Sequence, residues 1–163
     1  MVNLVIMRHG EAQPYAADDS LRQLTPDGQN DVRQMALWLK TVYANFDYVW
    51  SSPYLRAQQT AELMLEQQPA ECQFTLIPEL VPDAPAQTVK AQIDALLLAQ
   101  PNAKLLLVSH MPLVSFLVES LTEPGQAPIF STASLTCISY QPGQGGVVQE
   151  RNRPLALSVL PEI

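Results

Sequence analysis

The sequence predicts an α/β fold, a single domain of three layers (α/β/α) with helices on both faces of a mostly parallel central sheet. Between residues 2 and 121, short apolar segments of strand length alternate with longer amphipathic segments, the pattern of right-handed βαβ units. The 163 residues are 47% hydrophobic and 15% charged, which suits one domain with its own core. We therefore expect one domain spanning residues 1–163.

The chain begins with a predicted strand and a long helix. Residues 2–7 are almost uniformly apolar and end at Arg8, as expected of a buried strand. After a polar loop, Thr25 can cap a helix whose first position is Pro26, where a missing N–H costs nothing. Apolar residues then recur at helical spacing and are expected to face the core: Val32, Met35, Ala36, Leu39, Val42 and Tyr43.

Two more strands with a helix between them follow. Residues 46–50 and 72–77 have the apolar character of strands. Between them, Ser52 as cap and Pro53 at the first position predict the start of a helix. Residues 78–85 contain three prolines and predict a loop.

The second half continues the alternation and ends in two further strands. No repeat, linker or low-complexity segment interrupts it. The elements expected are a helix over 89–97, a strand over 105–109, a helix from Pro112 to Leu121, and strands over 134–140 and 155–160 on either side of the turn-rich segment 143–146.

Charge and composition exclude several classes of partner. Nine Lys and Arg residues against 16 Asp and Glu give a net charge of −7, which counts against general nucleic-acid binding. No apolar run approaches the roughly 18 residues of a membrane span, and the N-terminus has no signal-peptide pattern. Cys72 and Cys137 are isolated and are interpreted as core residues of a reducing compartment. We expect a cytoplasmic monomer that binds neither membrane nor nucleic acid.

Residues suited to phosphate chemistry follow the predicted strands. The only two histidines, His9 and His110, each come directly after a strand, with Arg8 beside the first. Arg56 lies about one turn into the helix after the second strand. Because ligands of such sheets bind at the carboxyl ends of the strands, these four residues can meet at one site. Two guanidiniums suit phosphate oxygens, and a neutral imidazole can bond to phosphorus.

Simpler interpretations of these residues remain. A single histidine at a strand end is more often structural, and a single arginine in a first helical turn is usually solvated. Two histidines without carboxylates at ligand spacing make a poor metal site, and neither common nucleotide-phosphate loop motif occurs. The residues alone leave open whether the site would turn a phosphate over or only bind it.

Four segments, in order, resemble motifs of the histidine phosphatase superfamily, which includes the phosphoglycerate mutases. They contain the R-H-G signature, an L-T-x-x-G segment, an S-S-P-x-x-R-A-x-Q-T-A segment and a late histidine motif. The four segments occupy residues 8–11, 21–28, 51–61 and 108–114. A single three-residue signature is weak evidence for a family, whereas four motifs in the right order are strong evidence.

Within that superfamily, the short loops leave no room for a lid insertion, and the chain resembles the compact SixA-type phosphohistidine phosphatases. The resemblance implies a minimal phosphoglycerate mutase-like fold and a metal-independent hydrolase without a cofactor. It implies that His9 is the transient phosphate acceptor and that Arg8, Arg56 and His110 hold the phosphate. The implied substrate is a signalling protein that carries phosphohistidine, and the product is inorganic phosphate.

Two further residues are candidates for supporting roles. Glu79 is at the place where many relatives carry a general acid, but the surrounding pattern is missing, and a solvated or structural acid is the simpler interpretation. Arg22 precedes the first helix and either adds to a positive basin around His9 or pairs with Asp18 or Asp19. The alternatives to a protein phosphatase are a phosphatase of small phosphate esters and a non-catalytic phosphate-binding module.

Overall fold

The computed structural model describes residues 1–155 and contains a six-stranded sheet of order β3-β2-β4-β1-β5-β6. The first four strands along the chain are mutually parallel where they pair, and the last two add an antiparallel edge. The predicted α/β class with a mostly parallel sheet is therefore confirmed. The strands are β1 (Leu4–Arg8), β2 (Tyr48–Ser51), β3 (Gln73–Leu76), β4 (Leu105–Ser109), β5 (Leu135–Gln141) and β6 (Gly145–Asn152).

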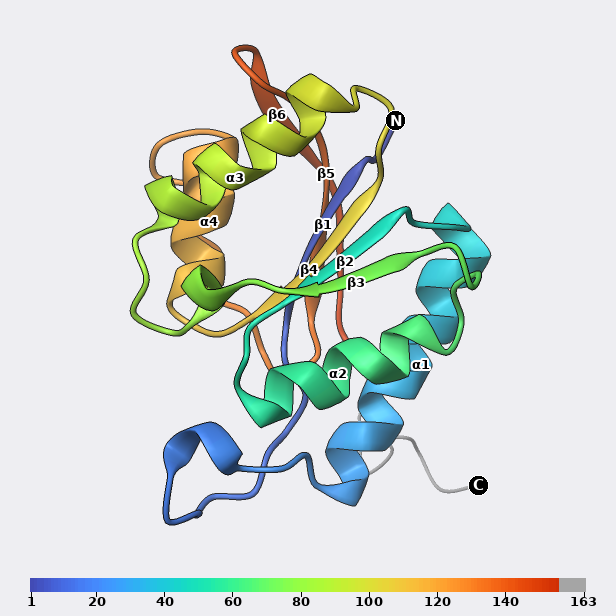
Figure 1. The fold of residues 1–163 in the computed structure, drawn as a ribbon, viewed down its shortest axis with the longest axis vertical. Coiled ribbons are helices and arrows are strands. Elements are labelled where there is room, and N and C mark those ends of the chain that lie inside the picture. Colours follow the sequence, from blue (N-terminus) through green and yellow to red (C-terminus); the bar gives the residue numbers. More distant parts are fainter. Residues whose placement is uncertain (156–163) are drawn as a thin grey trace.

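Helices cover both faces of the sheet, as predicted (Figure 1). On one face lie α1 (Pro26–Tyr43) and α2 (Leu55–Leu65), and on the other lie α3 (Ala86–Ala99) and α4 (Leu113–Leu121). Two 3-10 helices, η1 (Asp19–Leu21) and η2 (Pro78–Leu80), lie in the connecting loops. Each face of the sheet has its own hydrophobic cluster. No helix of residues 1–155 has the length and apolarity needed to cross a membrane.

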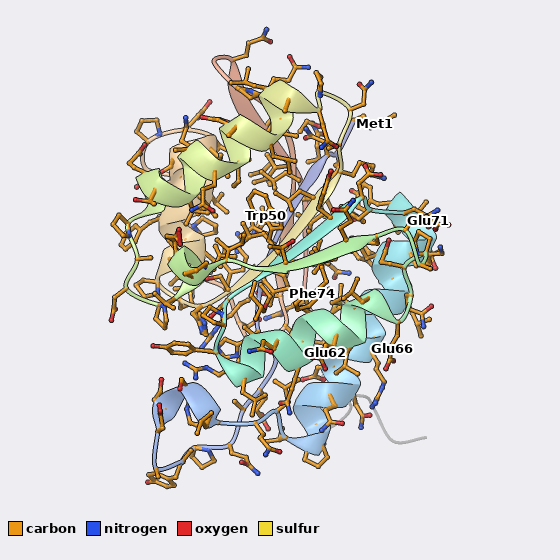
Figure 2. All side chains as sticks on the ribbon, in the orientation of Figure 1. Met1, Trp50, Glu62, Glu66, Glu71 and Phe74 are labelled. Atoms are coloured by element: carbon orange, nitrogen blue, oxygen red, sulfur yellow. The ribbon has the colours of Figure 1, made fainter. Side chains whose placement is uncertain are left out.

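The alternation of side chains along neighbouring strands separates the two clusters. Val49 of β2 pairs with Phe74 of β3, and both belong to the cluster under α1 and α2. Trp50, the next residue, belongs to the cluster under α3 and α4. Figure 2 shows Trp50 and Phe74 on opposite sides of these strands. The central strands β1, β2 and β4 are thus buried on both faces, which explains their continuous apolar runs, whereas β3 at the edge is mostly exposed.

The observed starts of the helices agree only in part with those predicted from the sequence. Thr25 caps α1 as predicted, since its side chain accepts a hydrogen bond from the Gly28 N–H. The prediction that Ser52 and Pro53 start the second helix is wrong, because α2 begins at Leu55 and Ser52 belongs to the preceding turn. Val42, a predicted core residue, is 48% exposed, because it lies roughly 80° from Val32 around the helix axis.

The last strand also differs from the prediction. Residues 145–152 form β6, although the sequence predicts a turn at 143–146 and the last strand at 155–160. Most of that predicted strand lies outside the described residues, and Leu155 is not in a strand. The side chains of β6 are mostly exposed and polar, so the edge strand lacks the alternating apolar pattern on which the prediction depends.

Candidate active site

The four predicted residues come together at the carboxyl edge of the sheet. Arg8 ends β1 and His9 follows it, while His110 follows β4, the parallel neighbour of β1. Arg56 is in the first turn of α2. All four line one cavity of about 430 Å³. The other residues lining it are Glu11, Ala12, Asp19, Arg22, Pro82, Met111 and Thr132.

His9 is held as a neutral imidazole with one nitrogen available. Its Nδ1 lies 2.7 Å from the Gly10 carbonyl oxygen, which can only accept, so Nδ1 carries the hydrogen. The lone pair is then on Nε2, 3.4 Å from Nε of Arg56. Burial, with a smaller contribution from Arg56 and Arg8, lowers the pKa of His9 to about 4. At neutral pH His9 is therefore uncharged, and its unprotonated Nε2, which accepts a long hydrogen bond from Arg56, is of the kind that can act as a nucleophile.

Close backbone packing fixes the segment that carries His9. The Gly10 N–H donates to Thr60 Oγ1 (3.0 Å), and this hydroxyl donates to the Arg56 carbonyl (2.8 Å), which ties the segment to α2. A Cβ at Gly10 would lie 2.8 Å from Cγ2 of Val32. A Cβ at Gly28 would lie 2.1 Å from the Glu11 carbonyl oxygen. These contacts give a physical reason for both glycines of the motif segments.

His110 lies against His9 and is also neutral. The centroids of the two imidazole rings are 5.1 Å apart. The ring of Tyr54 meets that of His110 edge-on, with 5.0 Å between their centroids. Its Nε2 is 2.8 Å from Ser52 Oγ, which already accepts from the Tyr54 N–H and can donate to Nε2. In that arrangement the ring hydrogen is on Nδ1, a buried atom without a partner in residues 1–155. Burial and the neighbouring His9 and Arg56 lower the pKa of His110 to about 2.

The two arginines are anchored by backbone carbonyls. Nη1 of Arg8 donates to the Phe130 carbonyl (2.9 Å), and Nη1 of Arg56 donates to the Asp19 carbonyl (2.9 Å). Burial lowers the pKa of both guanidiniums, but arginine stays cationic at neutral pH. Nη2 of Arg56 also lies 3.3 Å from the Asp19 carboxylate, and its Cζ lies 5.1 Å from the centre of the Tyr54 ring. Each fork is thus oriented before an anion binds.

The two supporting residues are placed differently. Arg22 lines the cavity, and its Nε also pairs with Asp19 at 2.8 Å. Glu79 is in η2 and does not line the cavity. Its Oε1 accepts a hydrogen bond from Gln92 of α3 at 2.8 Å.

Sequence reasoning missed several side chains that position the site. Ser52 and Thr60 both belong to the S-S-P-x-x-R-A-x-Q-T-A segment at residues 51–61. That motif is the signal that could have identified their roles. Tyr54, in the same motif, packs between His110 and Arg56. Asp19 is predicted only as a partner of Arg22, whereas it also pairs with Arg56. No pattern in the sequence indicates that second contact.

The arrangement suits a tetrahedral oxyanion whose central atom faces Nε2 of His9. Arg8, Arg22 and Arg56 all line one cavity, where they outnumber the Asp19 carboxylate that pairs with two of them. Planar guanidiniums match pairs of non-bridging oxygens. Donors oriented in advance stabilise charge on the equatorial oxygens of a transferring phosphoryl group. The site can therefore bind phosphate and can accept a phosphoryl group on nitrogen.

Replacing Arg56 by lysine is expected to reduce kcat/KM for phosphoryl transfer roughly 10- to 100-fold, because the charge stays but the planar fork is lost. Arg8→Lys should behave in the same way. The control is Arg33→Lys on the exposed surface of α1, which should be neutral. Kinetics of Arg56→Lys within a factor of about two of wild type would show that charge alone suffices.

The ionisation of His9 is expected to be visible by NMR. The folded protein should hold the neutral Nδ1–H tautomer from pH 8 down to nearly pH 4. Because the unfolded chain takes up this proton near pH 6.5, the free energy of unfolding should fall as the pH drops from about 6.5 to 4. Bound tungstate should raise the pKa of His9, since a neighbouring anion favours the charged imidazolium form. Titration of His9 near 6.5 in the free protein would contradict this description.

Comparison with known proteins agrees with this geometry. Residues 4–80 match the histidine phosphatase superfamily (branch 1). The chain is 34% identical to the phosphohistidine phosphatase SixA of Escherichia coli over 158 residues, 97% of this chain and 98% of that protein. The Haemophilus influenzae homolog of SixA is 27% identical over 94% of this chain and 98% of its own. The solved structure of the protein histidine phosphatase SixA with tungstate superposes with a TM-score of 0.87, at 34% identity, covering 93% of this chain and 96% of that chain.

Proposed function

The chain belongs to the histidine phosphatase superfamily, and we propose that it hydrolyses phosphohistidine on a signalling protein, with His9 as the transient phosphoryl acceptor. The observation that carries the proposal is the state of His9. Its Nδ1 hydrogen is held by the Gly10 carbonyl, and its Nε2 lone pair lies beside Arg56 in an anion-binding cavity. A site that only bound phosphate would need the arginines but not this imidazole.

The reaction has two displacements at phosphorus. Nε2 of His9 forms a P–N bond while the P–N bond to the substrate histidine breaks and its electron pair returns to the substrate ring. A substrate imidazole protonated on its other nitrogen leaves as a neutral ring and needs no general acid. Water then attacks the phosphorus, the electron pair returns to His9, and the water proton passes to solvent as inorganic phosphate forms. Arg8, Arg56 and His110 hold the phosphoryl oxygens in both steps.

The position of Glu79 supports a P–N rather than a P–O substrate. An alkoxide leaving group needs a proton donor, and Glu79 is bonded to Gln92 outside the cavity. Phosphohistidine does not need that donor. The proposal includes a protein substrate, no organic cofactor, a cytoplasmic location and a monomer.

Turnover of a substrate panel tests the proposal. A histidine-phosphorylated peptide, phosphoramidate, glycerol phosphates and sugar phosphates are compared at equal concentration, with and without EDTA. We expect the phosphohistidine peptide to have the highest kcat/KM and EDTA to have no effect. A higher kcat/KM for the phosphate esters would favour the small-ester alternative. Loss of turnover in EDTA that a divalent metal restores would overturn the metal-independent mechanism.

A further inference from the structure

A second cavity, of about 750 Å³, lies next to the active-site cavity, and the two share Arg8. It is formed by the end of β1, the segment 129–136 and the end of β6. The residues on which the inference depends, called here the arginine groove, are Arg8, Ile129, Ser134, Thr136, Arg151 and Arg153.

The strand register explains why the arginine groove is continuous with the site. Ile6 of β1, Thr136 of β5 and Arg151 of β6 are successive partners across the sheet and so lie on one face. Arg8 is two residues after Ile6, and Arg153 is two residues after Arg151. Because side chains alternate along strands, these two arginines extend the same face toward the carboxyl edge.

The arginine groove concentrates positive charge in an acidic protein. The chain has nine Lys and Arg residues and a net charge of −7, yet three of those nine line this groove. Within residues 1–155, none of the three forms an ion pair. Arg8 and Arg151 instead donate to the consecutive carbonyls of Phe130 and Ile129 (2.9 and 3.2 Å). This charge is therefore not neutralised within the described part of the chain.

Two buried donors of the groove have no partner. Thr136 is 1% exposed, and its Oγ1 has no hydrogen bond within the described residues. Nε of Arg8 is also buried and unpartnered there. Buried polar groups are nearly always paired, because an unpaired one costs about 1–3 kcal/mol. The groove thus offers donors and positive charge, which indicates a ligand with anionic oxygens.

We propose that the arginine groove binds acidic side chains of the substrate protein close to its phosphohistidine. The inference rests on the proposed function and adds a determinant of substrate choice. Arg8 and Arg153 are separated by one intervening strand, about 10 Å, which an extended peptide spans with about three residues. Glutamates within about three residues of the phosphohistidine therefore reach the groove while the phosphoryl group is at His9. Ile129, 82% exposed at the edge, adds an apolar contact.

Two histidine-phosphorylated peptides test the inference, identical except for glutamates or glutamines flanking the phosphohistidine. At low salt, the wild-type protein should prefer the glutamate peptide by about 5- to 10-fold in kcat/KM, mainly through KM. The preference should disappear in Arg151→Gln/Arg153→Gln and weaken with added salt. Arg33→Gln, an exposed arginine of α1, is the matched control and should keep the preference. Turnover of phosphoramidate should not change in any of these variants.

The outcomes separate this inference from the proposed function. The same preference in wild type and the double variant would overturn the groove's role. Equal losses for phosphoramidate and for the peptides would also overturn it, since the groove would then be a general anion site. If neither peptide is hydrolysed, the proposed function fails. Binding of the same peptide pair with a non-hydrolysable phosphohistidine analogue, measured by fluorescence anisotropy, then still tests the groove through the same ratio.

Discussion

His9→Ala is expected to lower kcat/KM for phosphohistidine hydrolysis at least 100-fold, within the ~10²–10⁴-fold cost of losing a catalytic group. No other residue of the cavity replaces it. The remaining imidazole, His110, has its Nε2 against Ser52. The carboxylate of Asp19 is paired with Arg22 and Arg56, and that of Glu11 accepts a hydrogen bond from Thr25. The measurement is phosphate release from a phosphohistidine peptide.

A folded variant is needed for that result to be interpreted. His9→Gln keeps most of the side-chain volume and is expected to lose turnover as severely as the alanine variant. Both proteins should still bind tungstate, because Arg8 and Arg56 remain. More than about a hundredth of wild-type kcat/KM in a variant that binds tungstate normally would exclude His9 as the nucleophile.

His110→Ala is expected to lower kcat by about 10²-fold or more, because a donor oriented toward the transferring phosphoryl group is lost. Unlike the His9 variants, it should still form some phosphoenzyme, since the nucleophile remains. A rapid-quench experiment separates the two steps. Ser52→Ala is the comparison variant, and its effect should be smaller, because it removes the contact that orients His110 and the hydrogen bond from the Tyr54 N–H but leaves the imidazole in place. A kcat for His110→Ala within about threefold of wild type would remove His110 from the chemistry.

The sequence is most informative where local pattern and topology agree. His9 and His110 both follow apolar strands, and parallel neighbours necessarily bring the ends of those strands together. Thr25 and Pro26 identify the start of α1 because capping depends on adjacent residues. The arrangement of the four main site residues at one edge can therefore be predicted from the sequence alone.

What the sequence does not predict depends on contacts between distant segments. The pairing of Asp19 with Arg56 depends on how the loop containing η1 folds back over α2. α2 begins at Leu55, and Ser52, the predicted cap, instead contacts His110, a residue far along the chain. The edge strand β6 is held by backbone pairing to β5 and has little apolar alternation to detect. Arg151 and Arg153, on and beside this strand, therefore carry no signal in the sequence.

The central claim is that a phosphoryl group resides on His9 during turnover. The most direct measurement is rapid quenching of the reaction at alkaline pH, where phosphohistidine survives, followed by mass spectrometry of the peptides. The mechanism predicts one phosphoryl group on the peptide that contains His9, present in wild type and in His110→Ala and absent in His9→Ala. A phosphoryl group on any other residue, or full turnover without a phosphorylated His9 within a single catalytic cycle, would contradict it.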